Sequence, residues 1–278
     1  MTIIENKVFS KERDFYGSNN IKLINCKFEG VEDGESAFKE ASNIEIEGCL
    51  WNLRYPFWHV NNLTINNTTL TENCRAALWY TNDINIDNSN LHGIKALREC
   101  SNVNISNTSI ISPEFGWFNH NVNMSNTTAV GEYFMMKTIN LNFNNVTLNG
   151  KYSFQYIENA TFNNCNFNTK DAFWHGKNIV VKDSIVKGEY LAWYSEDLTF
   201  INCKIIGTQP LCYCKNLKLI NCEMIDCDLA FEKSTVEAEI TTNVISIKNP
   251  TSGIITIPSV DELIINDPNS KCDIKVGN

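Results

Sequence analysis

NVNISNTSI, residues 102–110, and NLKLINCEM, residues 216–224, follow one pattern. In each stretch an Asn is followed by apolar residues at every second position, then by a second Asn, a small residue and a further apolar residue. Alternation with a period of two predicts a β-strand with one buried face. The same pattern recurs along most of the chain, so the repeat decides the fold.

The repeat has a nearly constant length. Eight of the ten intervals between its first apolar residues are 19 residues, and the other two are 21 and 23. Self-similarity at a fixed period of this size is typical of a solenoid, in which one repeat forms one turn. The first apolar residues are Ile21, Ile44, Leu63, Ile84, Val103, Val122, Leu141, Ala160, Ile179, Leu198 and Leu217.

Two polar positions predict where each turn bends, because Asn is replaced there only by Asp or Gly, which adopt a positive φ at least cost. Stacked Asn amides also donate and accept along their column. Nineteen residues then supply three short strands and a loop. The first column is Asn20, Asn43, Asn62, Asp83, Asn102, Asn121, Asn140, Asn159, Asn178, Asp197 and Asn216, and the second is Asn25, Gly48, Asn67, Asn88, Asn107, Asn126, Asn145, Asn164, Asp183, Asn202 and Asn221.

The predicted fold is therefore all-β, a single-stranded parallel β-helix of about 12 coils. We expect one domain over residues 1–278, in which residues 1–19 form an N-terminal capping coil, residues 20–233 the regular coils, and residues 234–278 atypical C-terminal coils and a cap. Terminal coils of a solenoid are atypical because they cover an open sheet edge.

Charge and composition exclude several classes of partner. The net charge is -9, and Lys and Arg are not clustered, which argues against nucleic acid. The chain contains no run of 18 apolar residues and no signal-like N-terminal segment, so we expect no membrane partner and a cytoplasmic protein.

The 11 cysteines are expected to be reduced, because Cys26, Cys49, Cys165, Cys203 and Cys222 occupy one inward column of small residues. No metal site and no cofactor are predicted.

The Asn corners, the inward ladder of Cys, Ser, Thr and Val, and segments such as YPFWH (residues 55–59) and ALWY (residues 77–80) carry a resemblance. The chain resembles an uncharacterised bacterial family of short-coil β-helix proteins within the pectin-lyase-like superfamily. This resemblance implies right-handed winding and, in many members, a carbohydrate along one exposed face. The Asp-Asp pair of polygalacturonase-like enzymes and the acidic calcium cluster of pectate-lyase-like enzymes are missing. The resemblance therefore carries over no catalytic residues.

One column of the predicted third strand is rich in Trp. Five of the six tryptophans lie five positions before a repeat start, and the residue before each is uncharged, so strand alternation predicts that the Trp column faces outward. The next column contains Glu40, Glu99 and Lys137, which we expect a β-bulge or a bend to turn outward as well. The Trp column is Lys39, Trp58, Trp79, Arg98, Trp117, Met136, Gln155, Trp174, Trp193 and Cys212.

Exposed aromatic rings among charged groups suit a sugar, which offers apolar faces and hydroxyls. We therefore predict an oligosaccharide ligand, with Glu99 and Arg98 as candidate catalytic residues of a lyase-like or hydrolase-like activity. Two alternatives stay open: the Trp rings pack beneath loops, or the face forms a homo-oligomer or partner contact. The candidate binding residues are Trp58, Trp79, Trp117, Arg54, Arg75, His59, Tyr80 and Glu40, and, in a second cluster, Trp174, His175, Trp193 and Tyr194.

Overall fold

The computed structural model describes residues 1–30 and 35–277. Within these ranges the chain is an all-β parallel solenoid of about 14 turns without a helix, so the predicted fold class is confirmed and the coil count was low by about two. The chain contains two compact units, Met1–Asn140 (unit 1) and Leu141–Asn278 (unit 2). We describe each unit separately.

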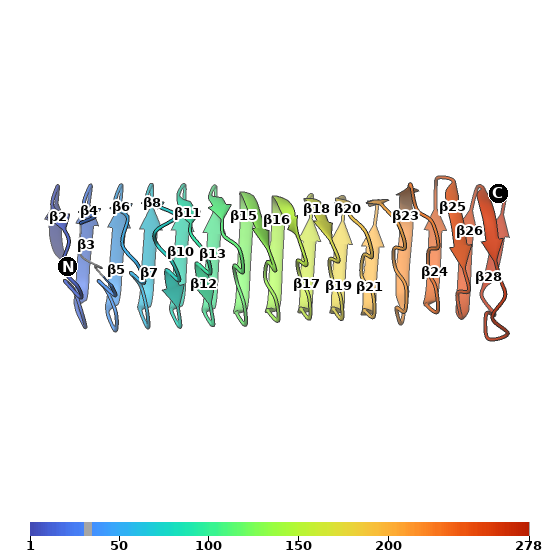
Figure 1. Cartoon of the computed structure of the whole chain (residues 1–278), viewed down its shortest axis with the longest axis horizontal. Helices are drawn as coiled ribbons and strands as arrows, with labels where there is room; N and C mark the ends of the chain where they lie inside the picture. The colour runs from blue at the N-terminus through green and yellow to red at the C-terminus, as the bar shows by residue number, and fades with distance from the viewer. Residues whose placement is uncertain (31–34, 278) are drawn as a thin grey trace. The chain divides into compact units, whose positions relative to one another are not determined.

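Unit 1 stacks its strands in chain order (Figure 1). Each turn contributes a longer and a shorter strand, and every pairing that joins these turns is parallel. The longer strands are β1 (Thr2–Glu5), β3 (Asn19–Ile24), β5 (Ser42–Glu47), β7 (Asn61–Asn66), β10 (Asn82–Asp87) and β13 (Ser101–Ser106). The shorter strands are β2 (Val8–Phe9), β4 (Lys27–Phe28), β6 (Leu50–Trp51), β8 (Thr69–Leu70), β11 (Asn90–His92) and β14 (Ser109–Ile111), and β15 (His120–Glu132) joins both types.

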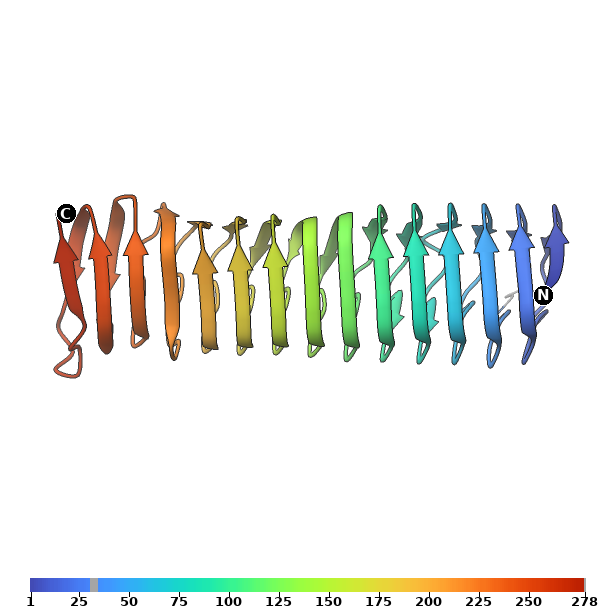
Figure 2. The ribbon, with the colours of Figure 1, turned by 180° about the vertical axis from the view of Figure 1, so that it is seen from behind.

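Unit 2 follows the same plan, and Figure 2 shows its strands from behind. The strand β16 (Ile139–Lys151) begins in the last residues of unit 1. The turn that joins Thr235 to its partner Ser252 is shorter than 19 residues, and a register shift lies between Leu219 and Cys222, where the Asn columns end. The strands are β17 (Glu158–Asn163), β18 (Asn166–Lys170), β19 (Lys177–Lys182), β20 (Ile185–Lys187), β21 (Glu196–Ile201), β22 (Lys204–Ile206), β23 (Leu217–Ile225), β24 (Thr235–Ile240), β25 (Val244–Lys248), β26 (Ser252–Ile257), β27 (Val260–Ile264) and β28 (Asp273–Val276).

Both polar columns form corners as predicted, because every residue in them has a φ between 46° and 63°. The amides also form ladders: Asn121 Nδ2 donates to Asn102 Oδ1 at 2.9 Å, and Asn178 Nδ2 donates to Asn159 Oδ1 at 2.8 Å. The amide–amide bonds of these two columns run in one direction, from each coil to the coil before it.

The predicted third strand is mostly absent. In the described part of the chain this side of the coil is a strand at β9 (Leu78–Trp79) and β12 (Leu97–Arg98), and again in the last coils at β25 and β27. In unit 2 left-handed residues alternate with others, as at Asp171, Phe173 and His175, whose φ values are 54°, 63° and 54°. An alternating left-handed backbone cannot form the extended ladder of a sheet. We call this segment, which precedes each longer strand, the third arc.

The core consists of aliphatic and aromatic side chains from all three sides. Phe28 and Trp51 stack with ring centroids 3.7 Å apart in unit 1, and Phe154 and Phe173 stack at 5.3 Å in unit 2. The five cysteines of the inward column are buried, as predicted. None of the described residues forms a helix long and apolar enough to span a membrane.

Candidate functional site

The column after the Trp column, which we call the outer column, is turned outward by the backbone. Its members His59, Tyr80 and Glu99 have φ values of 55°, 58° and 52°. A left-handed residue reverses the strand alternation, and this brings the side chain to the surface. The predicted outward orientation is confirmed, and of the two predicted causes, a β-bulge or a bend, the observed one is a bend, which forms a third corner. The outer column is Glu40, His59, Tyr80, Glu99, Phe118, Lys137, Tyr156, His175, Tyr194 and Tyr213.

Left-handed backbone is unfavourable for such side chains, by roughly 1 kcal/mol or more at each position. Ring stacking between adjacent coils offsets part of this energy. His59 and Tyr80 stack at 4.8 Å in unit 1, and His175 stacks on Tyr194 at 5.1 Å in unit 2. The outer column therefore behaves as an aromatic counterpart of the Asn ladders.

The Trp rings are half-buried and not fully exposed. Each indole N–H donates to the backbone carbonyl of a left-handed residue in the third arc of the next coil, and in unit 2 Gln155 makes the same contact with the Asp171 carbonyl at 3.4 Å. This finding supports the alternative in which the Trp rings pack against loops. The acceptors are Ala76 for Trp58 (2.6 Å), Lys95 for Trp79 (2.7 Å), Tyr133 for Trp117 (2.7 Å), Tyr190 for Trp174 (2.6 Å) and Gln209 for Trp193 (2.8 Å).

The hydrogen bond of the indole predicts that two substitutions of Trp193 differ in their effect on the free energy of unfolding. Trp193→Phe keeps a ring against Trp174 but removes the donor to the Gln209 carbonyl, and we expect it to lower the free energy of unfolding by about 1 kcal/mol. Trp193→Gln keeps a donor of the Gln155 type but removes the ring, and should be less stable still. Urea denaturation followed by circular dichroism measures both. Wild-type stability of Trp193→Phe would show that the indole bond contributes nothing.

Unit 1 assembles the first predicted cluster into one stack. Trp58 and Trp79 lie parallel with centroids 5.3 Å apart. The Arg98 guanidinium carbon follows at 5.1 Å from the Trp79 ring and 5.7 Å from the Trp117 ring. Arg98 Nε also pairs with Glu99 Oε1 at 3.2 Å. The planar guanidinium thus takes the place of an indole in the Trp column, which is a favourable cation–π arrangement.

A depression of about 540 Å³ opens beside this guanidinium, lined by Arg98, Glu99, Phe118 and His120. Arg98 and Lys137 lie over the Phe118 ring, at 5.4 Å and 5.5 Å from its centroid. The depression therefore combines an apolar ring, guanidinium and imidazole groups, and one carboxylate.

Phe118 and His120 were not among the predicted binding residues. His120 pairs in register with Ser101, and Ser101 with Asn82, so an imidazole in a column of small polar residues was the available signal. None of the eight binding residues predicted for the first cluster lines the depression, which takes only Arg98 and Glu99 from the predicted site. Arg54 pairs with Glu35 at 3.4 Å, while Arg75 and Glu40 are exposed on other coils.

Unit 2 assembles the second predicted cluster. Trp174 and Trp193 lie parallel at 5.5 Å, and beside them Tyr156, His175, Tyr194 and Tyr213 form a continuous stack with spacings of 4.9, 5.1 and 4.8 Å. Tyr156 and Tyr194 are 45% and 47% exposed, so ring edges face solvent. Burial, reinforced by the Glu232 carboxylate, raises the pKa of Tyr213 to about 12.

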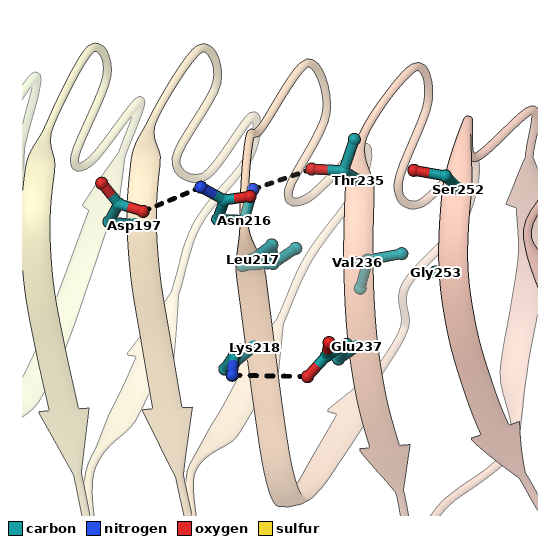
Figure 3. A pocket seen from close by; sticks show the side chains of 9 residues that line it. All are labelled: Asp197, Asn216, Leu217, Lys218, Thr235, Val236, Glu237, Ser252 and Gly253. Atoms are coloured by element: carbon teal, nitrogen blue, oxygen red, sulfur yellow. Dashed lines mark hydrogen bonds and ion pairs between the residues drawn. The ribbon is translucent and has the colours of Figure 1, made fainter.

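A further depression of unit 2, of about 490 Å³, lies where the first Asn column ends (Figure 3). The Asn216 amide donates to Asp197 at 3.0 Å, and its backbone N–H donates to Thr235 Oγ1 at 2.8 Å. Gly253 is required in this lining, because an added Cβ would lie 1.9 Å from the Val236 carbonyl oxygen of the neighbouring coil. No aromatic ring lines this polar surface, and its groups continue the corner ladder.

The described residues contain no group of three or more His, Cys, Asp or Glu side chains that could hold a metal ion. The run Cys212, Cys214, Cys222 and Cys227 is buried, and burial raises the pKa of the Cys212, Cys214 and Cys227 thiols to about 12. These thiols are neutral core groups at ordinary pH.

A family model described as a protein of unknown function (DUF3737) matches residues 2–276. The chain belongs to the DUF3737 family. No curated protein matches this DUF3737 chain. Among solved structures it is similar to HetL, a pentapeptide repeat protein involved in heterocyst differentiation regulation from the cyanobacterium Nostoc, with 14% identity over 80% of this chain and 92% of HetL and a TM-score of 0.29. It is also similar to the periplasmic alginate epimerase AlgG, with 10% identity over 94% of this chain and 78% of AlgG and a TM-score of 0.25. At such TM-scores neither likeness bears on the activity of the DUF3737 chain.

Proposed function

We propose that unit 1 binds a carbohydrate in the depression lined by Arg98, Glu99, Phe118 and His120. The observation that carries this proposal is the depression itself, which places hydrogen-bonding groups of both signs beside an aromatic ring. Sugar hydroxyls donate to a carboxylate and accept from guanidinium and imidazole groups, while sugar C–H groups pack on rings. The ligand is expected to meet the stack at Arg98, beside the depression, because the faces of Trp58 and Trp79 cover one another.

Binding without hydrolysis is the form of this proposal that the residues support best. Hydrolysis of a glycosidic bond commonly requires two carboxyl groups flanking the bond. The depression is lined by one carboxylate, Glu99, which is already paired with Arg98 at 3.2 Å. We therefore assign Arg98 and Glu99 to recognition. The pectin-lyase-like ancestry suggested by the sequence stays a prediction.

Titration calorimetry with a panel of neutral and acidic oligosaccharides tests the proposal. We expect at least one member of the panel to bind the wild-type protein and Arg98→Gln to weaken that binding at least tenfold, since each charge-assisted hydrogen bond contributes about 1.5–3 kcal/mol. Gln occupies the same column at position 155, so the variant suits the coil. Lys218→Gln, on the exposed pair with Glu237 in unit 2, is the control and should bind normally. Absence of any binding, or equal binding by Arg98→Gln, contradicts the proposal.

A further inference from the structure

Tyr194 and Tyr213 form a stacked tyrosine pair in unit 2. Their ring centroids lie 4.8 Å apart with an interplanar angle of 12°. Both residues sit at left-handed corners of adjacent coils, with φ values of 62° and 61°, so their side chains leave the backbone in parallel. Tyr194 is 47% exposed, which leaves its ring accessible to a small or macromolecular oxidant.

The surroundings of the pair favour loss of an electron together with a proton. The Tyr213 hydroxyl donates to Glu232 Oε2 at 3.3 Å, so a carboxylate is in place to accept the phenolic proton. Lys248 Nζ pairs with the other oxygen of that carboxylate at 3.1 Å and holds it there. Trp193 lies edge-on to Tyr213 at 5.3 Å and is a second readily oxidised ring.

From this geometry we propose that Tyr194 and Tyr213 are a modification site at which oxidation joins two adjacent coils through a dityrosine bond. A haem peroxidase with hydrogen peroxide is the class of oxidant. Each phenol loses one electron and one proton, and the two radicals join through a carbon ortho to each hydroxyl. The two ortho hydrogens then move to the oxygens and restore the phenols. The pair loses two electrons and two protons in total, which reduce one hydrogen peroxide to two waters.

The cross-link has a structural consequence. It closes a covalent loop of one coil, which restricts the unfolded chain and so favours the folded state. His175 separates Tyr194 from Tyr156, with a ring on each side at 5.1 and 4.9 Å, so Tyr156 has no direct access to Tyr194. The inference concerns unit 2 and does not depend on carbohydrate binding by unit 1.

Treatment of the dilute full-length protein with horseradish peroxidase and hydrogen peroxide tests the inference. We expect dityrosine fluorescence in the monomer band of a denaturing gel, and a cross-linked peptide pair containing Tyr194 and Tyr213 that is lighter by two hydrogens. Tyr194→Phe and Tyr213→Phe keep the stacked ring and should each reduce the monomer fluorescence at least tenfold. Tyr156→Phe is the matched control and should leave that peptide pair unchanged.

Three results would overturn the inference. Dityrosine confined to the dimer band would assign the reaction to a contact between two copies of the chain. Undiminished monomer fluorescence in Tyr194→Phe would place the bond elsewhere. A peptide in which Tyr194 is joined to His175 would show that the imidazole is the partner.

Discussion

Raising the pH from 9 to 10 is expected to lower the free energy of unfolding on the order of 5 kcal/mol. The cause is a set of buried thiols. Burial raises the pKa of Cys74, Cys100, Cys212, Cys214 and Cys227 from an ordinary value of 9.0 to about 12. Below pH 9 each thiol is neutral in both states, so this stability is fully present.

The sign follows from the protons that each state binds. Between pH 9 and pH 12 the unfolded chain releases thiol protons that the native chain retains. Stability therefore falls by about 1 kcal/mol for each thiol from pH 9 to 10, where the unfolded thiol is still partly protonated, and by about 1.4 kcal/mol per pH unit above that. The loss continues until the folded thiols titrate near pH 12. Urea denaturation at pH 7, 8, 9 and 10 measures it.

The chain itself provides a matched control for the thiol effect. Cys100 and Cys214 donate to the carbonyls of Leu78 and Ala192 at 3.1 Å each. Ser195 and Ser234 make the equivalent bonds at 2.6 and 2.7 Å. The double variant Cys100→Ser/Cys214→Ser therefore keeps the hydrogen bonds. Between pH 7 and pH 10 its free energy of unfolding should fall by about 3 kcal/mol less than that of the wild type. Identical pH profiles would show that tyrosine and lysine titration, rather than thiol burial, sets the alkaline limit.

Phe173→Ala is expected to lower the free energy of unfolding by about 3–5 kcal/mol, the range for an aromatic side chain removed from a core. Phe173 is fully buried and stacks on Phe154 at 5.3 Å, with Phe162 at 5.5 Å and Phe167 at 6.3 Å. Removal of its ring leaves a cavity among three other rings, which cannot all move to fill it.

Two controls separate packing from backbone effects at this position. Ala192 occupies the equivalent place in the next coil with a φ of 60°, so the backbone accepts Ala there. Phe173→Leu keeps most of the side-chain volume, and it should lower the free energy of unfolding by less than half as much as Phe173→Ala. Urea denaturation at pH 7 gives both values. A loss below 1 kcal/mol for Phe173→Ala would mean that the core of unit 2 collapses around the cavity.

The sequence predicts those parts of the fold in which a residue type strongly favours one backbone conformation. Asn62 and Asn67 mark corners because few other residues favour a positive φ, and both corners are observed. The third corner was missed since His59 and Tyr80 carry no such signature and depend on stacking between coils. The last coils were undercounted because Thr235 and Ser252 take the place of Asn in the first column.

The candidate site was only partly predictable for a related reason. The position of Arg98 in the Trp column follows from the repeat, and the structure places it between Trp79 and Trp117. The half-burial of the Trp rings does not follow from alternation, because it depends on a carbonyl of the next coil that a left-handed residue leaves free for the indole. His120 lines the depression from a neighbouring coil, and the one signal for it was an imidazole in a column of small polar residues.

The single direction of the Asn ladders bears on how the protein is made. Within each unit an amide hydrogen of a later coil meets an oxygen that the earlier coil already presents, as between Asn121 and Asn102 or Asn221 and Asn202. A chain emerging from the ribosome can therefore add one finished turn after another, each using the last as its template. Synthesis and folding can advance together, and no turn has to wait for residues at the far end of the chain.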